Sequence, residues 1–431
     1  MNAPSRHLLL AVLFTLGGSS VFAQTPDARL ETAIGHIVPA ITAIRHQIHQ
    51  HPELSNREFQ TAELVAAHLR SLGLDVQTKI AHTGVVGVLK GGRPGPVVAV
   101  RADMDALPVI EDTPYPFRST VRTTYSGQEV GVMHACGHDV HTAVMLGVAS
   151  VLASVRDQVQ GTVMFIFQPA EEGAPSGEEG GAQLMLKEGL FQDLHPSAVF
   201  GLHSNADIPV GKIGYAPGAT NASSDAFNIT LMGRSAHAPF PQLSVDPVVM
   251  AAQAVLALQT IRSRNLSPFE PSVITVAEIH GGVRNNIIPE DVRLGGTVRL
   301  FSAQAQDEVE RRMGQILGGI AQAAGGSYKL EYSRGYPSSV NNTALVERTL
   351  PAIERSVGKE NVQRGAPSMA ADDFAYFAEE VPAFFFRLGT VKPGTTSGNN
   401  HTPTFMADDG AIPVGIRVMV NVLLDYLRSA A

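Results

Sequence analysis

The sequence has 431 residues, of which 44% are hydrophobic and 17% charged, with a formal net charge of −8 and a single cysteine. An acidic chain without a run of Lys or Arg argues against nucleic acid as a partner, and one cysteine excludes an internal disulfide. At about 150 residues per domain, the length predicts two or three domains.

The first predicted element is an export signal. Arg6 precedes a short apolar run from Leu8 to Leu16, and Val21-Phe22-Ala23 resembles a cleavage site before Gln24. The apolar run is shorter than the roughly 20 residues that a membrane-spanning helix needs. We therefore expect a signal peptide at residues 1–23 and a periplasmic or secreted protein without stable membrane insertion. An uncleaved membrane anchor is the alternative.

The next elements predict an α/β domain. Apolar positions recur at helical spacing over residues 28–72, and Gly73 follows as a stop signal. Short, almost continuous apolar strands then alternate with helical stretches, which is typical of a mostly parallel sheet covered on both faces. A helix is expected at about 139–156, and strands at 97–100, 162–168, 197–203 and 383–389.

The middle of the chain has a different pattern. Its elements follow the order βαββαβ, which is the ferredoxin-like split arrangement. Strands are predicted at 225–233, 272–282, 291–301 and 327–333, and helices at 246–263 and 304–322. We therefore expect an inserted domain at about 218–330 between two parts of the first domain, 24–217 and 331–431.

Two adjacent glutamates directly follow a predicted buried strand. Ligands bind open α/β sheets at the carboxyl ends of the strands, and Glu171 and Glu172 in PAEEG lie at such an end. Their side chains are expected to diverge, so that one binds a metal and the other faces a water, the usual arrangement for general-base hydrolysis. A solvated acidic turn is the alternative, and it is our interpretation of the later pair Glu178-Glu179.

The single cysteine, Cys136, lies in HACGHDVHTA beside His138. Gly137 lets the loop turn tightly, and Asp139 is the predicted N-cap of the next helix. Sulfur and imidazole at a helix N-terminus suit zinc or another borderline-soft divalent ion. The alternatives are a buried free thiol and a Cys–His nucleophile, and the nucleophile needs a base that hydrogen-bonds the thiol.

Other polar residues at strand ends are expected to join the same centre. His203 ends a predicted strand, and His401 lies almost 200 residues later in NNHTPTF. Asp105, close to Asp103 in RADMDALP, is expected to orient a ligand histidine or to contact a metal. Supporting or structural roles are expected for His134 and His141.

The inserted domain carries three further polar residues of interest. His237 lies in GRSAHAPFPQ, Asn286 in NNIIPE and Arg299 in GGTVR. A guanidinium recognises a carboxylate by two parallel hydrogen bonds, which makes Arg299 a candidate for holding an acidic group. A salt bridge on the face of a strand is the alternative for Arg299.

In this order, the motifs resemble the amidohydrolase branch of the zinc aminoacylase and carboxypeptidase family. The motifs are RADMDALP, HACGHDVHTA, PAEEG, GLH, SAHAPFPQLSVDP, NNIIPE, GTVR and NNHTPTF. The resemblance covers about residues 30–428. It implies a catalytic domain of the zinc-exopeptidase type with two divalent metal ions per subunit. Zinc is the expected metal, and manganese, cobalt and nickel are the alternatives. The resemblance also implies that the ferredoxin-like domain is a lid and joins two subunits into a homodimer.

The resemblance further implies a role for each matching residue. The residues that match metal ligands are Cys136, His138, Glu172, His203 and His401. Glu171 matches the general base, with Asp105 beside the centre. His237 matches a lid histidine that, in dimeric relatives, reaches the partner subunit's active site. Asn286 and Arg299 match residues that hold the carboxylate of the substrate.

The resulting prediction is metal-dependent hydrolysis of the amide bond in an N-acyl amino acid with an acetyl, benzoyl or larger acyl group. Two stretches depart from the family near the acyl pocket: SNADIPVG after His203, and NNHTPTF, which lacks the common serine after the histidine. The alternatives are a carboxypeptidase or dipeptidase with the same metals, and a non-catalytic exported binding protein. The adjacent Glu171 and Glu172 argue against the binding protein, which has no use for a base beside a metal.

Overall fold

A computed structural model describes residues 28–429, and the expected signal peptide lies outside this range. Its largest element is an eight-stranded sheet in the order β1-β2-β6-β3-β7-β18-β8-β17. The four neighbouring strands β6, β3, β7 and β18 are parallel, which confirms the mostly parallel sheet at the centre of the fold. The strands are β1 (Asp75–Ile80), β2 (Gly84–Lys90), β3 (Arg93–Asp103), β6 (Gln160–Gln168), β7 (Val199–Pro209), β8 (Ile213–Tyr215), β17 (Val362–Arg364) and β18 (Ala383–Val391).

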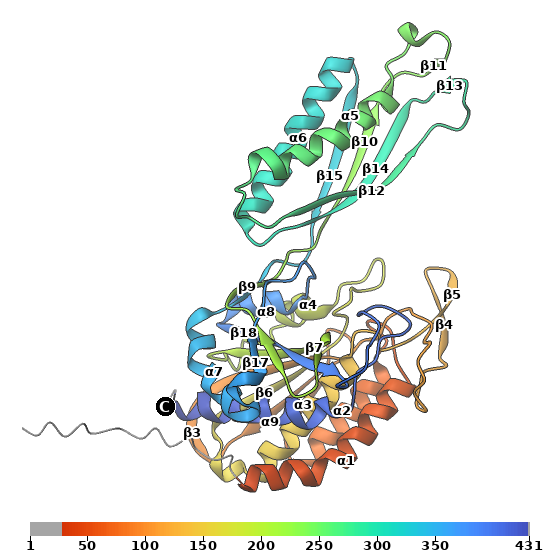
Figure 1. Ribbon diagram of the computed structural model, residues 1–431. Coiled ribbons are helices and arrows are strands. Elements are labelled where there is room, and N and C mark those ends of the chain that lie inside the picture. Colours follow the sequence, from red (N-terminus) through yellow and green to blue (C-terminus); the bar gives the residue numbers. More distant parts are fainter. Residues whose placement is uncertain (1–27, 430–431) are drawn as a thin grey trace, which may run out of the picture.

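Helices cover both faces of this sheet (Figure 1). One face packs against α1 (Ala28–Gln50), α2 (Phe59–Ser71), α3 (His138–Ser154), α7 (Thr343–Val357) and α9 (Ala411–Ser429). The other face packs against α4 (Gly181–Lys187) and α8 (Phe374–Glu380). Helix α3 is apolar on all sides and almost entirely buried, because α1, α9 and the sheet surround it.

The single helix expected over residues 28–72 is wrong, because the chain breaks between α1 and α2. Pro52 cannot donate a backbone hydrogen bond and disfavours helical geometry at the residue before it. Asn56 then adopts a left-handed conformation, with φ at 60°. The Glu53 carboxylate accepts the backbone N–H groups of Gln60 (3.0 Å) and Thr61 (2.9 Å), which begin the second helix.

Strand β7 also differs from the expectation, because it does not end at His203. It continues to Pro209 and pairs with β18 along its length, which places His203 directly opposite Arg387. The loop expected at SNADIPVG is therefore part of the strand. As a result, β7 and β18 extend past the edge of the sheet where the other central strands end.

Residues 225–334 form a smaller unit with the observed order βαββαβ. Its antiparallel sheet has the strand order β12-β14-β10-β15, and both helices pack on one face around a separate hydrophobic core. The elements are β10 (Asp225–Met232), α5 (Pro247–Thr260), β12 (Val273–Gly281), β14 (Asp291–Arg299), α6 (Ala303–Ala324) and β15 (Ser327–Arg334).

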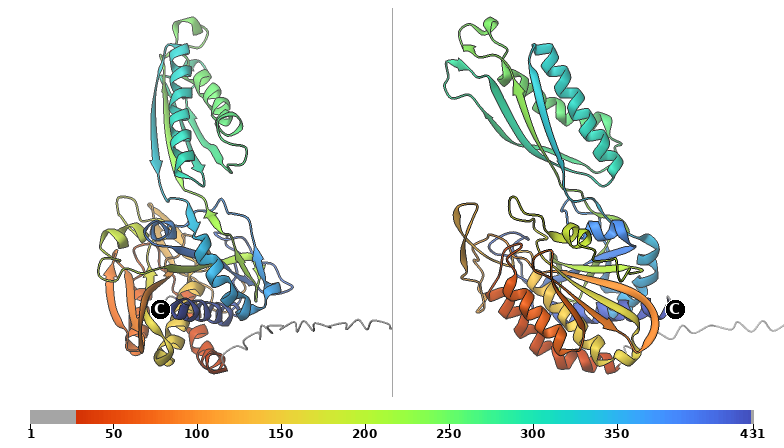
Figure 2. Two further views of the ribbon diagram at one scale, coloured as in Figure 1. Left: turned by 90° about the vertical axis from the view of Figure 1, so that its left-hand side faces the viewer. Right: turned by 180° about the vertical axis from the view of Figure 1, so that it is seen from behind.

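The chain enters and leaves this unit beside the large sheet (Figure 2). Strand β9 (Gly218–Asn221) pairs there with β16 (Ser339–Asn341). Another short pair, β11 (Ala236–His237) with β13 (Ile287–Ile288), lies at the opposite end of the unit, away from the large sheet (Figure 1). Asp225, the first residue of β10, and Arg299, the last of β14, therefore lie at the end of the unit that faces the large sheet.

The remaining elements are short and lie in connections. They are the hairpin β4 (Arg122–Tyr125) and β5 (Gln128–Gly131), the 3-10 helices Arg156–Gln158, Pro241–Leu243 and Lys359–Asn361, and a π-helical turn at Ile261–Asn265. Within residues 28–429, no helix combines the length and the hydropathy needed to cross a bilayer.

Candidate metal and catalytic site

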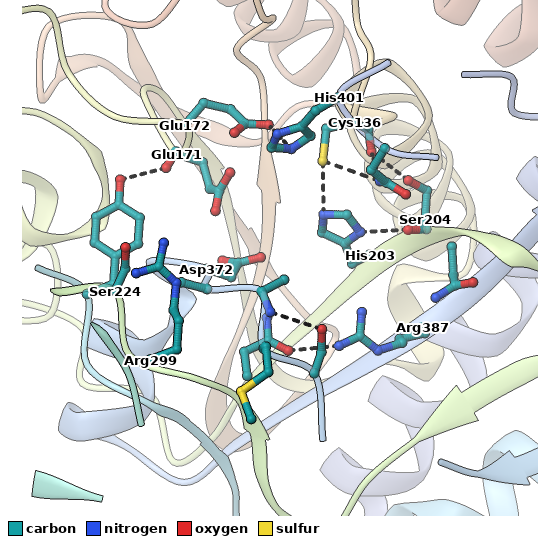
Figure 3. A pocket seen from close by; sticks show the side chains of 18 of the residues that line it. Cys136, Glu171, Glu172, His203, Ser204, Ser224, Arg299, Asp372, Arg387 and His401 are labelled. Carbon is teal, nitrogen blue, oxygen red and sulfur yellow. Dashed lines mark hydrogen bonds and ion pairs between the residues drawn. The ribbon is translucent and has the colours of Figure 1, made fainter. Parts of the chain in front are cut away.

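A cavity of about 500 Å³ opens where the central parallel strands end. The end of β6, the strands β7 and β18, the loop before α3 and the loop after β18 all contribute to it. Predicted site residues gather on one wall, as Figure 3 shows. They are Cys136, Glu171, Glu172, His203 and His401.

The side-chain atoms of the predicted metal ligands lie close together. Cys136 Sγ is 3.4 Å from His203 Nε2, and His401 Nε2 is 3.2 Å from Glu172 Oε1. His138 Nε2 lies 3.8 Å from the same Glu172 oxygen. Ligand atoms lie within 4.8 Å of one another in the group Cys136, His138 and His203 and in the group Cys136, Glu172 and His401. Two neighbouring positions for a cation therefore share these side chains.

Hydrogen bonds orient the two buried histidine rings of the cluster. Nδ1 of His138 contacts Asp105 Oδ1 at 3.1 Å, whereas its buried Nε2 has no hydrogen-bond partner among residues 28–429. Nδ1 of His203 donates to the Ser204 carbonyl at 2.6 Å, which leaves Nε2 with a lone pair. Glu172 Oε1 is also buried without a hydrogen bond. Thiol, imidazole and carboxylate donors held in this way fit two divalent ions of the zinc type.

Gly137 lets Cys136 and His138 face the same cluster. Its φ of 87° is left-handed, and a Cβ at this position would collide with the Ser204 hydroxyl. That hydroxyl donates to the Cys136 carbonyl at 2.6 Å, and Asn400 Nδ2 lies 3.4 Å from Cys136 Sγ. Burial, followed by the charge of Glu172, raises the pKa of the Cys136 thiol, so a thiolate here needs a cation beside it.

Asp139 is not the N-cap that we expected. Gly137 occupies the N-cap position without a side-chain cap, and Asp139 lies in the first turn of α3. Its carboxylate instead binds Arg45 at 2.7 Å and His49 at 2.8 Å, which ties this end of α3 to α1. Burial alone would raise the pKa of Asp139, but Arg45 and His49 outweigh it and hold this pKa well below its usual range.

Glu171 lies at the inner edge of the cavity, next to the cluster. Its side chain is buried, and Oε2 lies 3.8 Å from His138 Nε2. Burial, followed by the charges of Asp372 and Glu172, raises the pKa of Glu171 well above its usual range. The Tyr336 hydroxyl donates to the backbone carbonyl of Glu171 at 2.8 Å and fixes this turn. A carboxylate with a raised pKa is suited to accepting a proton at neutral pH.

A buried ion network below the site is absent from the sequence prediction. Arg101 in β3 is fully buried and binds Asp103 at 2.7 Å, Asp373 at 3.1 Å and Asp372 at 3.2 Å. Its Nε donates to Gln168 Oε1 at 2.8 Å. The signal that could have revealed it is an arginine inside the apolar strand VVAVRAD, because such a charge requires partners.

Two arginines reach the cavity from opposite sides (Figure 3). Arg299 is half-buried at the end of β14, and its Nη1 donates to the backbone carbonyls of Val298 (3.0 Å) and Asp225 (3.4 Å). Arg387, which the sequence prediction missed, comes from β18 and donates to Asn221 Oδ1 at 2.9 Å. Neither guanidinium has a carboxylate within ion-pair distance among residues 28–429. The alternative salt bridge for Arg299 is therefore wrong.

His237 and Asn286 are not brought to this cavity. Both lie in the β11–β13 region at the far end of the smaller unit, where the His237 ring is exposed. His237 Nδ1 donates to the Asn286 backbone carbonyl at 3.0 Å. The two residues are neighbours of each other, as the sequence motifs suggest, but they are separated from Arg299 by the length of β14.

Comparisons with known proteins give relatives over most of the chain. Residues 99–425 match the family model described as Peptidase family M20/M25/M40. IAA-amino acid hydrolase ILR1-like 2 of Arabidopsis thaliana is 33% identical over 435 residues, covering 98% of this chain and 94% of the relative. Thermostable carboxypeptidase 1 of Saccharolobus solfataricus is 35% identical over 391 residues, covering 90% of this chain and 95% of the relative. The Bacillus subtilis YXEP protein, described as a dinuclear metal binding peptidase, has a TM-score of 0.76 at 32% identity, covering 91% of this chain and 99% of that one.

Proposed function

This chain belongs to peptidase family M20/M25/M40, and from that membership we propose that it hydrolyses the amide bond between an acyl group and an amino acid. Membership of this family identifies the chain as a hydrolase that acts on C–N bonds. The observation that carries the choice of substrate is the position of Arg299, which faces the cavity and has no carboxylate within ion-pair distance in the described part of the chain. The free carboxylate of an N-acyl amino acid would form an ion pair with the Arg299 guanidinium.

The proposed metal ligands are Cys136, His138, Glu172, His203 and His401, and zinc is the preferred ion over manganese, cobalt or nickel. Two such ions, when bound, lower the pKa of a water and polarise the carbonyl of the amide. The chain contributes the orientation of the ligands, because Asp105 and the Ser204 carbonyl fix the two histidine rings. The thiol of Cys136 contributes a soft donor that favours zinc.

Glu171 is the proposed general base. It accepts a proton from the attacking water and then passes that proton to the nitrogen of the departing amino acid. Its buried position, with Oε2 3.8 Å from His138 Nε2, suits both steps, because it keeps the carboxyl group beside the proposed ligands. Tyr336 positions Glu171 through the hydrogen bond to its backbone carbonyl.

We also propose that the chain acts as a homodimer. Asn286 joins Arg299 in holding the carboxylate, and His237 stabilises the carbonyl oxygen as negative charge develops on it. Both residues lie far from the cavity of their own chain, so this proposal has His237 and Asn286 enter the cavity of a second copy. The exposure of His237 at the end of the smaller unit supports this role. The smaller unit would then serve as a lid.

A carboxypeptidase or dipeptidase activity at the same metal centre is the second candidate. The similarity to thermostable carboxypeptidase 1 favours it, because that relative is as similar to this chain as the IAA-amino acid hydrolase. Both activities require the same metal ligands, the same general base and the same residues that bind the carboxylate. Their substrates differ only in the group on the acyl side of the scissile bond.

The experiment compares the two substrate classes on purified protein that has been chelated and then reconstituted with zinc or manganese. Initial rates are measured with N-acetyl and N-benzoyl amino acids and with dipeptides that have the same C-terminal residue. The proposal expects kcat/KM to be at least about tenfold higher for the N-acyl compounds, equivalent to about 1.4 kcal/mol in the transition state. Preference for the dipeptides would replace it by the second candidate. Absence of turnover in either class with bound metal would favour an exported binding protein.

Export is the remaining part of the proposal, and it rests on residues 1–23 alone. The test is fractionation of a bacterial host that expresses the full chain, with N-terminal sequencing of the mature product. Recovery in the periplasm or medium with Gln24 at the new N-terminus is expected. Recovery in the membrane with Met1 retained would indicate an uncleaved anchor.

A further inference from the structure

Arg387 is the one charged residue of β18, whose other residues are apolar except for Thr390. It follows Phe384, Phe385 and Phe386 in β18, and those three side chains are buried. The Arg387 side chain points into the cavity, on the side opposite Arg299 and next to the cluster of predicted ligands (Figure 3). Its position is set by the pairing of β18 with β7, which places it beside His203.

Arg387 makes no ion pair with any of the residues that the structure describes. Its hydrogen bond to Asn221 Oδ1 engages one nitrogen of the guanidinium, and no carboxylate of residues 28–429 lies within ion-pair distance of it. Asp372, whose charge acts on Arg387, already pairs with the buried Arg101 at 3.2 Å. A half-buried guanidinium without a partner is costly, and a carboxylate is the group that best matches its remaining N–H donors.

The rest of the cavity wall is also polar. Among residues 28–429 its neutral polar lining includes Asn205, Asn221, Ser224 and Ser368, and Tyr336, Met369, Ala370 and Ala371 contribute apolar surface; Asp207 and Asp372 also line the cavity. A pocket for a large aromatic group is normally lined by apolar and aromatic side chains. The lining therefore favours a polar group over a long apolar acyl group, and the two arginines are its positions for negative charge.

We propose that Arg387 binds a second carboxylate of the substrate, in addition to the one that Arg299 holds. This inference rests on the proposed function, and it narrows the substrate class to N-acyl amino acids with two carboxylates. The second carboxylate comes from one of two sources: the side chain of an acidic amino acid, or an acyl group derived from a dicarboxylic acid. Either source places a carboxylate on each side of the cavity.

The kinetic test uses matched pairs that differ only in a carboxylate and its amide. N-acetylglutamate is compared with N-acetylglutamine for the amino-acid side, and N-succinylglycine with N-succinamoylglycine for the acyl side. We expect the wild-type enzyme to prefer the carboxylate in one pair by about 10- to 100-fold in kcat/KM. The pair that shows the preference identifies the source of the second carboxylate.

Arg387→Gln should reduce this preference to within about threefold, mainly through a higher KM for the carboxylate member. The control is Arg93→Gln, the same change at an exposed residue at the opposite end of the sheet, and it should preserve the preference. Absence of a preference in both pairs would overturn the inference. An equal loss for both members in Arg387→Gln would also overturn it, because it would mean that Arg387 only balances the charge of Asp372.

A binding measurement separates this inference from the proposed function. Titration calorimetry on the metal-loaded protein compares the binding of glutarate with that of its monoamide. Each compound offers one carboxylate to Arg299 or the metals, and only glutarate offers a second one to Arg387. Glutarate should bind at least about tenfold more tightly to wild type, and Arg387→Gln should remove that difference. Equal affinities in wild type, or an unchanged difference in the variant, would refute the role of Arg387. If no N-acyl amino acid is hydrolysed, the proposed function fails and this titration alone decides the role of Arg387.

Discussion

Asp105 Oδ1 lies 3.1 Å from Nδ1 of His138, and the other ring nitrogen, Nε2, faces Glu171 and Glu172 at 3.8 Å. The second oxygen of Asp105 accepts the Ser55 hydroxyl at 2.7 Å and the Glu172 backbone N–H at 3.0 Å. One buried carboxylate thus sets the orientation of a predicted ligand and the backbone of another. The arrangement is that of a carboxylate that holds a metal-binding histidine in the correct tautomer.

Asp105→Asn should therefore weaken metal binding. We expect the metal affinity to fall by about 10- to 100-fold, because the amide does not stabilise the ligand histidine as a carboxylate does. Competition with a metallochromic chelator measures the affinity directly. Asp75→Asn, the same change at an exposed residue of β1, is the control and should bind metal as wild type does. Wild-type affinity in Asp105→Asn would show that Asp105 does not support the site.

Cys136→Ala should lower the number of metal ions bound per subunit. Cys136 is shared by both groups of close ligand atoms, so its loss affects both cation positions. Native mass spectrometry of the reconstituted protein gives the stoichiometry, and circular dichroism shows whether the fold is retained. An unchanged stoichiometry in a folded variant would remove Cys136 from the ligand set. It would then be a buried free thiol.

Arg299→Ala should raise KM for substrates with a free carboxylate by about 10- to 100-fold, because a charge-assisted pair is lost. A carboxylate-blocked analogue, the methyl ester of the same N-acyl amino acid, should be almost unaffected. Steady-state kinetics with both compounds provides the test. An equal rise in KM for the acid and for the ester would count against the proposal that Arg299 binds the carboxylate of the substrate.

His237→Ala should lower kcat while leaving metal content unchanged, because the ring is proposed to act on the carbonyl oxygen of a second chain. Mixing His237→Ala with Glu171→Gln separates the two possible arrangements. If His237 crosses the dimer, the hybrid contains one complete site, and activity above that of either variant appears after subunit exchange. If His237 acts in its own chain, no site is complete and the mixture stays as inactive as its components.

The elements of the fold were predictable where the apolar pattern was long and regular. The strands that end in RADMDALP and PAEEG and the βαββαβ order were all predicted, because burial on both faces leaves an almost continuous apolar run and burial on one face leaves a clear periodicity. The break at Pro52 was missed, since the apolar spacing continues on both sides of it. The extension of β7 beyond His203 was also missed, because pairing with β18 stabilises a polar stretch that has no strand pattern of its own.

The candidate site was predictable to the extent that its residues follow strands in recognisable motifs. Arg387 and Arg101 were overlooked, although each interrupts an apolar strand and therefore signals a buried partner or a ligand. Tyr336 and Asn221 could not be found in this way, because their contacts depend on how the two sheets are connected. The spatial separation of His237 from Arg299 could not be predicted either, since proximity in sequence does not show that a long strand separates the two residues.

The most direct test of the account is the activity and metal content of Glu171→Gln. The variant keeps the shape of the side chain but cannot accept the proton, so we expect kcat to fall by about 10²- to 10⁴-fold. Metal content, measured by mass spectrometry on the same preparation, should equal that of wild type, because Glu171 is not among the proposed ligands. The exposed Glu179→Gln provides a matched control with wild-type activity, and chelated wild type should be inactive until metal is restored. Wild-type turnover by the metal-loaded Glu171→Gln variant, or by metal-free wild type, would contradict the account.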